Sequence, residues 1–87
     1  MIERRMLRMP DVAAKTGLRK VTIYKHIRLG TLPRPIKIGE RASVWPSDEI
    51  EAVLSARVAG RSEVEIKSLV SKLMTARTAG TEAANAQ

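Results

Sequence analysis

The chain of 87 residues contains no cysteine and only one histidine, His26. Without thiolates, neither a disulfide framework nor a cysteine-ligated metal site can form. One imidazole cannot supply the three or four clustered ligands that zinc requires, so we expect no metal and no cofactor. We also expect no enzyme, because the sequence has no glycine-rich phosphate loop and no nucleophile paired with a base.

Aromatic side chains are scarce: the chain has no phenylalanine, one tyrosine and one tryptophan. Proteins that bind single-stranded nucleic acid stack bases on several exposed aromatic rings, so this composition argues against that mode of binding. Trp45, the single tryptophan, is predicted to anchor the core instead of stacking on a base. Tyr24 leaves two alternatives open, packing against a neighbouring element or hydrogen-bonding a phosphate.

Long apolar runs are also missing. The longest uncharged stretches are too short to cross a bilayer, and residues 1–5 lead into no apolar signal core. We therefore expect a cytoplasmic protein with no membrane partner. The length allows one small domain with an appendage, because two independent cores would not fit.

Positive charge is concentrated in the first half of the chain, within an overall formal charge of +7. Residues 1–45 hold eleven lysines and arginines against three carboxylates, a charge of +8, whereas residues 46–87 hold five against six, a charge of −1. A basic segment beside a near-neutral one indicates a polyanionic partner such as DNA. A merely solvated basic surface would give the same composition, so the decision depends on the residue pattern.

The segment after residue 9 has the pattern of a helix-turn-helix. Pro10 and Asp11 are typical of a helix start, and Gly17 ends that helix after about two turns. A second helix is predicted from about residue 19 to residue 29, with Gly30 as its C-cap.

The second of these helices has the features of a recognition helix. Its period of about 3.6 residues turns Ile23 and Ile27 toward the core, and His26 is interpreted as a boundary residue. The opposite side is basic, with one hydroxyl and one small apolar side chain among the charges, a mixture that suits the major groove. The residues predicted to contact DNA from this helix are Arg19, Lys20, Val21, Thr22, Tyr24, Lys25 and Arg28.

A short hairpin is predicted directly after the recognition helix. Two prolines within residues 31–35 favour an extended connection, residues 36–38 alternate as a strand, and residues 43–45 return after a glycine-containing turn. Such a hairpin is a wing, and Lys37 and Arg41 are placed where a wing can reach the minor groove or its phosphates. The predicted fold class is therefore mainly α with a small β-hairpin, a winged helix-turn-helix.

Two further helices are predicted in the second half. Ser47 is a favourable N-cap for a third helix that ends near Gly60, and its acidic first turn is explained by the helix dipole and by solubility. A capping box opens a fourth helix over residues 63–77. The acidic residues are Asp48, Glu49 and Glu51, and the apolar stripe of the third helix is Ile50, Val53, Leu54 and Val58.

These predictions divide the chain into a winged helix-turn-helix at residues 1–59, a C-terminal helix at residues 60–77 and a disordered tail at residues 78–87. The fourth helix can either complete the core of the monomer or dock on another copy along DNA. Since the winged segment is long enough for a small core of its own, intermolecular use is slightly favoured. The candidates for self-association are Ile66, Leu69, Val70, Leu73 and Met74.

The segments in register with a known family are Leu7-Arg8-Met9-Pro10-Asp11-Val12, Thr16-Gly17-Leu18, Val21-Thr22-Ile23-Tyr24-Lys25, Leu32-Pro33-Arg34-Pro35-Ile36-Lys37-Ile38-Gly39, Arg41 and Trp45. Over about residues 6–54 the chain resembles the AlpA-like phage regulatory proteins, which belong with the small winged-helix excisionases, or recombination directionality factors. Two features depart from the family pattern. Arg19 stands where the family usually has a capping serine, and the fourth helix extends beyond the minimal domain.

The resemblance implies a MerR- or excisionase-like winged helix-turn-helix that binds double-stranded DNA in a phage, prophage or integrative and conjugative element. One implied role is that of an excisionase, which binds and bends attachment-site DNA cooperatively so that an integrase excises the element. The other is that of a transcriptional activator of an integrase or excision gene. Small size and the extra helix favour excision, with DNA, further copies of the chain and a site-specific integrase as partners.

Overall fold

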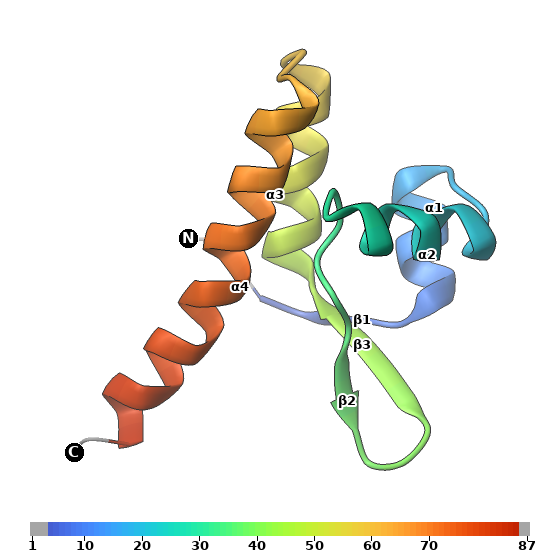
Figure 1. Ribbon diagram of the computed structural model, residues 1–87. Coiled ribbons are helices and arrows are strands. Elements are labelled where there is room, and N and C mark those ends of the chain that lie inside the picture. The colour runs from blue at the N-terminus through green and yellow to red at the C-terminus, as the bar shows by residue number, and fades with distance from the viewer. Residues whose placement is uncertain (1–3, 86–87) are drawn as a thin grey trace.

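The computed structural model describes residues 4–85, which form four helices and three short strands (Figure 1). In chain order these are β1 (Met6–Leu7), α1 (Met9–Thr16), α2 (Lys20–Leu29), β2 (Ile36–Ile38), β3 (Ala42–Pro46), α3 (Ser47–Val58) and α4 (Glu63–Asn85). The strands form one antiparallel sheet in the order β1-β3-β2. The predicted winged helix-turn-helix with an additional C-terminal helix is confirmed, and β1 adds a third strand to the predicted hairpin.

The helices lie on two sides of the sheet (Figure 1). α1 and α2 form the helix-turn-helix on one side, and α3 and α4 run antiparallel to each other on the other side. The β2–β3 hairpin projects away from both, and the turn between α3 and α4 lies at the opposite end of the molecule from the hairpin tip. None of the helices within residues 4–85 is long and apolar enough to cross a membrane.

Local interactions fix the helix-turn-helix where the sequence predicts it. Gly17 ends α1 with a φ of 72°, a left-handed conformation that glycine adopts without the steric cost of a Cβ. The Thr16 hydroxyl donates to the Val12 carbonyl at 2.8 Å and accepts the Leu18 N–H at 3.2 Å, which holds the turn. Leu18 packs against the core, and Ile23 of α2 is fully buried.

One core joins all the helices. Trp45 is fully buried, and its indole Nε1 donates to the Pro33 carbonyl at 2.9 Å, which confirms its predicted role as the anchor of the wing. The buried apolar residues of this core are Leu7, Val12, Ile23, Leu32, Trp45, Ile50, Val53, Ile66 and Val70. Because α4 contributes two of these residues, the winged segment shares its core with the C-terminal helix.

Of the two uses predicted for α4, the structure shows that its apolar stripe completes the core of the single chain. Ile66 and Val70 are 0% and 1% exposed within a single chain, so neither side chain is available as a self-association contact. Three further members of the stripe, Leu69, Leu73 and Met74, are partly buried against the same core. The reason is that the side of α3 that carries Ile50 and Val53 needs a cover, and α4 supplies it.

The ends of α3 also differ from the prediction. Ser47 does not cap the helix; Pro46 is the N-cap residue, and the Ser47 hydroxyl accepts the N–H of Arg5 at 2.8 Å. Val58 does not belong to the buried stripe, since it is 89% exposed at the end of the helix. The β1–β3 pairing brings Arg5 next to Ser47, a long-range contact that no local pattern encodes.

The start of α4 follows the prediction, and its end does not. Ser62 and Glu65 form the predicted capping box, with the Ser62 N–H donating to the Glu65 carboxylate at 3.0 Å and the Glu65 N–H donating to the Ser62 hydroxyl at 3.2 Å. The helix continues to Asn85, where a disordered tail was predicted from residue 78. Alanine is frequent in this segment and has the highest helix propensity, and no proline interrupts it. Residues 86–87 of the predicted tail, and residues 1–3, lie outside the described part of the chain.

Candidate nucleic-acid interface

The outward side of α2 is open to solvent. Val21 is 73% exposed, whereas Ile23, two residues later, is fully buried. Thr22 is half-buried, so it lies nearer the edge of this surface than the sequence suggests. The predicted contact residues that the structure leaves exposed are Arg19, Lys20, Val21, Tyr24, Lys25 and Arg28. This side of α2 thus offers four cations and two less polar side chains to a partner.

The first turn of α2 has no side-chain cap. Arg19 is the N-cap residue, with extended backbone angles of φ −78° and ψ 159°, and it makes no capping hydrogen bond through its side chain. The Ile23 N–H donates to the Arg19 carbonyl at 2.9 Å. Backbone N–H groups at an uncapped helix start carry the positive end of the helix dipole and attract anions. The departure from a capping serine therefore suits this helix start to a phosphate.

The wing extends the same basic character. Lys37 lies on β2 opposite Ser43, and Arg41 lies in the turn between β2 and β3; both are exposed. Ile38, at the hairpin tip, is an exposed apolar residue. Glu40 is the one carboxylate of residues 12–47 and stands beside Arg41. The wing therefore presents two cations, with one acidic side chain between them in sequence.

The carboxylates that form ion pairs lie next to cations outside α2 and the wing. Among residues 4–78, the ion pairs are Arg4–Asp48, Lys15–Glu51, Arg57–Glu63, Arg61–Glu65 and Arg77–Glu49. None of these pairs involves a cation of α2 or of the wing. The cations of these two elements are therefore not engaged in these ion pairs, and they are available for an external polyanion.

The paired carboxylates are held in their charged form. The Arg4 guanidinium hydrogen-bonds Asp48 at 2.8 and 2.9 Å and holds the pKa of that carboxyl below its usual range. Arg57 lowers the pKa of Glu63 in the same way, through a hydrogen bond of 2.8 Å. The backbone N–H and the hydroxyl of Ser62 lower the pKa of Glu65. These carboxylates therefore stay ionised at neutral pH.

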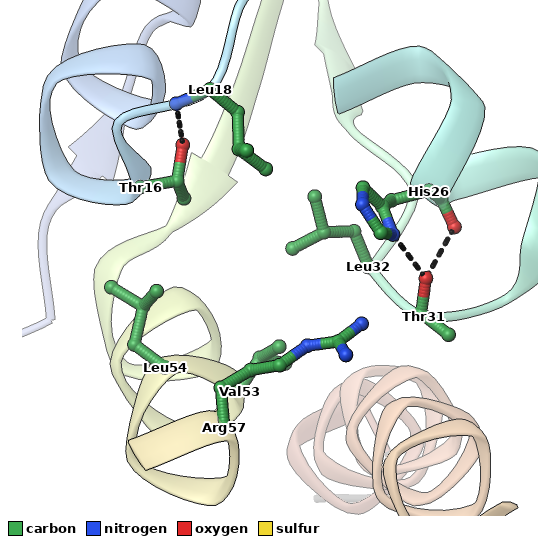
Figure 2. Close-up of a pocket in the computed structure, with 8 residues that line it drawn as sticks. All are labelled: Thr16, Leu18, His26, Thr31, Leu32, Val53, Leu54 and Arg57. Atoms are coloured by element: carbon green, nitrogen blue, oxygen red, sulfur yellow. Dashed lines mark hydrogen bonds between the residues drawn. The ribbon is translucent and has the colours of Figure 1, made fainter. Parts of the chain in front are cut away.

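A cavity of about 350 Å³ lies between the helix-turn-helix and α3 (Figure 2). His26 sits half-buried at its edge, with Nδ1 2.8 Å from the Thr31 hydroxyl oxygen. That hydroxyl donates to the His26 carbonyl at 3.2 Å, so the imidazole Nδ1–H must be the donor in the other bond. His26 thus ties the end of α2 to the connection that follows it. No cluster of three or more histidine, aspartate or glutamate side chains able to hold a metal occurs among residues 4–78.

The structure contains a buried ion pair, between Glu49 and Arg77, that the sequence did not predict. The prediction explained Glu49 by the helix dipole and by solubility, but its side chain is only 1% exposed. Arg77 Nε donates to its two carboxylate oxygens at 3.1 and 2.9 Å, and Arg77 Nη2 donates to the Arg34 carbonyl at 2.9 Å. Arg77 therefore ties α4 both to α3 and to the connection between α2 and β2. Glu49 and Arg77 lie 28 positions apart in the chain, so no local pattern predicts this contact.

Comparisons with known proteins find relatives of this chain. The family model described as "Prophage CP4-57 regulatory protein (AlpA)" matches residues 5–58, which span β1 to α3 and stop before α4. The chain is also similar to an uncharacterized protein, ORF88, of Enterobacteria phage P4. The identity is 37% over 59 residues, which cover 68% of this chain and 67% of that protein. No solved structure matches the chain.

Proposed function

Because the chain belongs to the AlpA family of prophage regulatory proteins, which implies a DNA-binding regulator, we propose that it binds double-stranded DNA sequence-specifically and without catalysis. α2 enters the major groove, and the wing contacts the neighbouring minor groove or its phosphates. The observation that carries the proposal is the distribution of ion pairs. In each ion pair, the cation that the carboxylate contacts lies outside α2 and the wing. The cations of α2 and of the wing therefore form a basic surface on these two neighbouring elements.

α2 and the wing contact different parts of the DNA. Lys25, near the middle of α2, donates to guanine, and the exposed Val21 contacts a thymine methyl group. Arg19 and Lys20 stand at the helix start, where phosphates bind. Arg41 in the wing anchors the protein through the sugar-phosphate backbone, so it adds affinity with little preference for sequence.

We further propose that the binding controls excision of a mobile element. Several copies bind attachment-site DNA side by side, bend it and bias a site-specific integrase toward excision, at the bacterial nucleoid. This role needs a small, basic, DNA-deforming protein and no reactive side chain. Any self-association uses surfaces other than Ile66 and Val70, because both are buried in the monomer. The family's description as regulatory proteins supports a second candidate, a transcriptional regulator of the integrase or excision gene that uses the same surface.

The first experiment measures binding to a labelled duplex by fluorescence anisotropy between 50 and 200 mM salt. We expect the association constant to fall steeply, with a logarithmic slope of about −0.9 for each phosphate neutralised. Lys25→Gln should weaken binding, whereas Lys72→Gln, an exposed lysine of α4, serves as the matched control and should not. No binding of the wild-type protein to any duplex at 50 mM salt would overturn the proposal.

A second experiment separates the two roles. The protein is added to the integrase and the attachment sites of its own element, and excision is scored together with DNA bending in a mobility-shift assay with permuted sites. Excision that depends on the protein, with bent DNA, supports the excisionase role. Normal excision without the protein, combined with a changed transcript level of the integrase or excision gene, supports the regulator instead.

A further inference from the structure

The connection between α2 and β2 is held rigidly at Arg34. The Arg34 N–H donates to the Met74 sulfur at 3.5 Å, and its carbonyl accepts Arg77 Nη2 at 2.9 Å, so both backbone polar groups bond to side chains of α4. The preceding carbonyl, that of Pro33, accepts the indole Nε1 of Trp45. Prolines on both sides of Arg34 restrict φ at their own positions and exclude helical geometry at the residues before them. This residue therefore has a backbone position determined by two elements that lie far away in sequence.

The side chain of Arg34 contrasts with this fixed backbone. It is exposed, and it forms no ion pair with any side chain of residues 4–78. Holding a long cationic side chain on a pre-ordered backbone lowers the entropy lost when the cation binds a partner. The exposed guanidinium of Arg34, on a backbone held in place, is therefore suited to bind an anion.

The place of Arg34 in the fold points to the identity of that anion. It lies between α2, which carries the basic outward side, and β2, which carries Lys37. If α2 lies in a major groove and the wing in the adjacent minor groove, the segment that joins them passes over the sugar-phosphate strand between the grooves. A planar guanidinium bonds phosphate oxygens through two parallel donors, which suits arginine to this position.

We propose that Arg34 is a third DNA anchor, which binds a backbone phosphate between the contacts of the recognition helix and those of the wing, and that α4 positions it. The proposal rests on the proposed DNA-binding function. Arg77 and Met74 are positioning residues in this scheme, because they contact the backbone of Arg34 and not the DNA. The matched family region ends at residue 58, so this use of α4 lies beyond it.

The test compares Arg34→Gln, Arg34→Lys and the control Arg61→Gln by anisotropy between 50 and 200 mM salt. Arg61 is an exposed arginine in the turn between α3 and α4, at the opposite end of the molecule from the wing (Figure 1). Losing one phosphate contact should reduce the logarithmic salt slope by about 0.9, so the affinity ratio between wild type and Arg34→Gln should shrink about 3.5-fold over this fourfold range of salt. Arg34→Lys keeps the charge and should keep most of the slope, and Arg61→Gln should leave affinity and slope unchanged.

The positioning role is tested by a double-mutant cycle with Arg77→Lys, which keeps a cation near Glu49 but cannot fork the carboxylate and also reach the Arg34 carbonyl. Arg34→Gln should then cost a smaller factor in affinity than it does in the wild-type background. All binding is measured where Trp45 fluorescence shows folded protein, and Met74→Leu, which removes the sulfur acceptor, replaces Arg77→Lys if that variant does not fold. An equal cost in both backgrounds refutes the positioning role.

The outcomes separate this inference from the proposed function. If the wild-type protein binds duplex DNA and Lys25→Gln weakens it, but Arg34→Gln has the wild-type slope, then Arg34 is no anchor and the DNA-binding proposal stands. If no variant, including the wild type, binds duplex DNA, both fail. A uniform loss of affinity on specific and random duplexes in Arg34→Gln supports a phosphate contact, whereas a loss confined to one base position refutes it and indicates a base contact.

Discussion

Removing the cation of the buried Glu49–Arg77 pair should destabilise the protein more than any other single change of a charged residue outside the DNA-binding surface. Arg77→Met keeps an unbranched apolar side chain at this position of α4 and deletes the guanidinium. The Glu49 carboxylate, 1% exposed, would then be buried without the group that now donates to both of its oxygens. Breaking a buried ion pair from one side costs about 3–5 kcal/mol.

That cost is large for a chain of this length, whose whole free energy of unfolding is expected to be roughly 4–13 kcal/mol. For domains of this size each kcal/mol lowers Tm by about 4–8 °C, so Arg77→Met should melt at least about 12 °C below the wild type. Trp45 is the single tryptophan and is fully buried, so its fluorescence reports unfolding by heat or urea directly.

Two comparisons make the test specific. Arg57→Met removes the guanidinium from the exposed pair with Glu63 and should change the free energy of unfolding far less than Arg77→Met, because solvent screens this pair. The double variant Glu49→Met, Arg77→Met removes both charges and should recover most of the lost stability, because no carboxylate is left buried alone. A free energy of unfolding for Arg77→Met within 1 kcal/mol of the wild type would show that Glu49 is solvated or re-paired, and the reasoning would be refuted.

Three further predictions concern the DNA-binding surface and acid stability. Lys25→Ala should weaken binding and relax the sequence preference at one base position, whereas Arg41→Ala should weaken binding to all duplexes and lower the salt slope by about 0.9. Selection from a randomised duplex library distinguishes the two variants. Identical sequence profiles would contradict the assignment of Lys25 to a base and Arg41 to the backbone. Glu40→Gln should tighten binding, because it removes the one carboxylate of residues 12–47 next to the proposed wing contact; anisotropy at 50 mM salt measures this, and unchanged affinity would place the hairpin tip away from phosphates. The folded pKa values of Asp48, Glu63 and Glu65 lie below their ordinary values, so their stabilising contribution is present above the ordinary carboxyl range and is lost as the pH falls through the lowered values. The urea midpoint should therefore drop on acidification below about pH 4, and Asp48→Asn should reduce that drop; an equal drop in the variant would remove Asp48 from the explanation.

Local patterns in the sequence predict much of the fold. Gly17 and Gly30 end helices where the sequence places them, and both have the positive φ that favours glycine. The capping box at Ser62 forms as predicted, because its two hydrogen bonds join residues only three positions apart. The burial of Ile23 and the exposure of Val21 follow from the period of α2 alone.

The sequence also identifies most of the candidate site, because the residues of α2 are neighbours along one helix and their common face follows from its geometry. Arg34 was not selected, since an arginine between two prolines has no period that assigns it to a face. Val58 was assigned to the buried stripe because it fits the helical spacing, but the helix ends there and nothing covers it.

The sequence by itself determined the positions of most helices and of the β2–β3 hairpin, which side of α2 is basic, and the family of the protein. These properties depend on contacts between residues close together in the chain. Only the tertiary structure decided the use of α4: Ile66 and Val70 complete the core instead of meeting another copy, and Arg77 joins a buried Glu49 to the backbone of Arg34. The physical reason is that an amphipathic stripe predicts the burial of one helix face but not the surface that buries it. That surface depends on which distant segments the fold brings together.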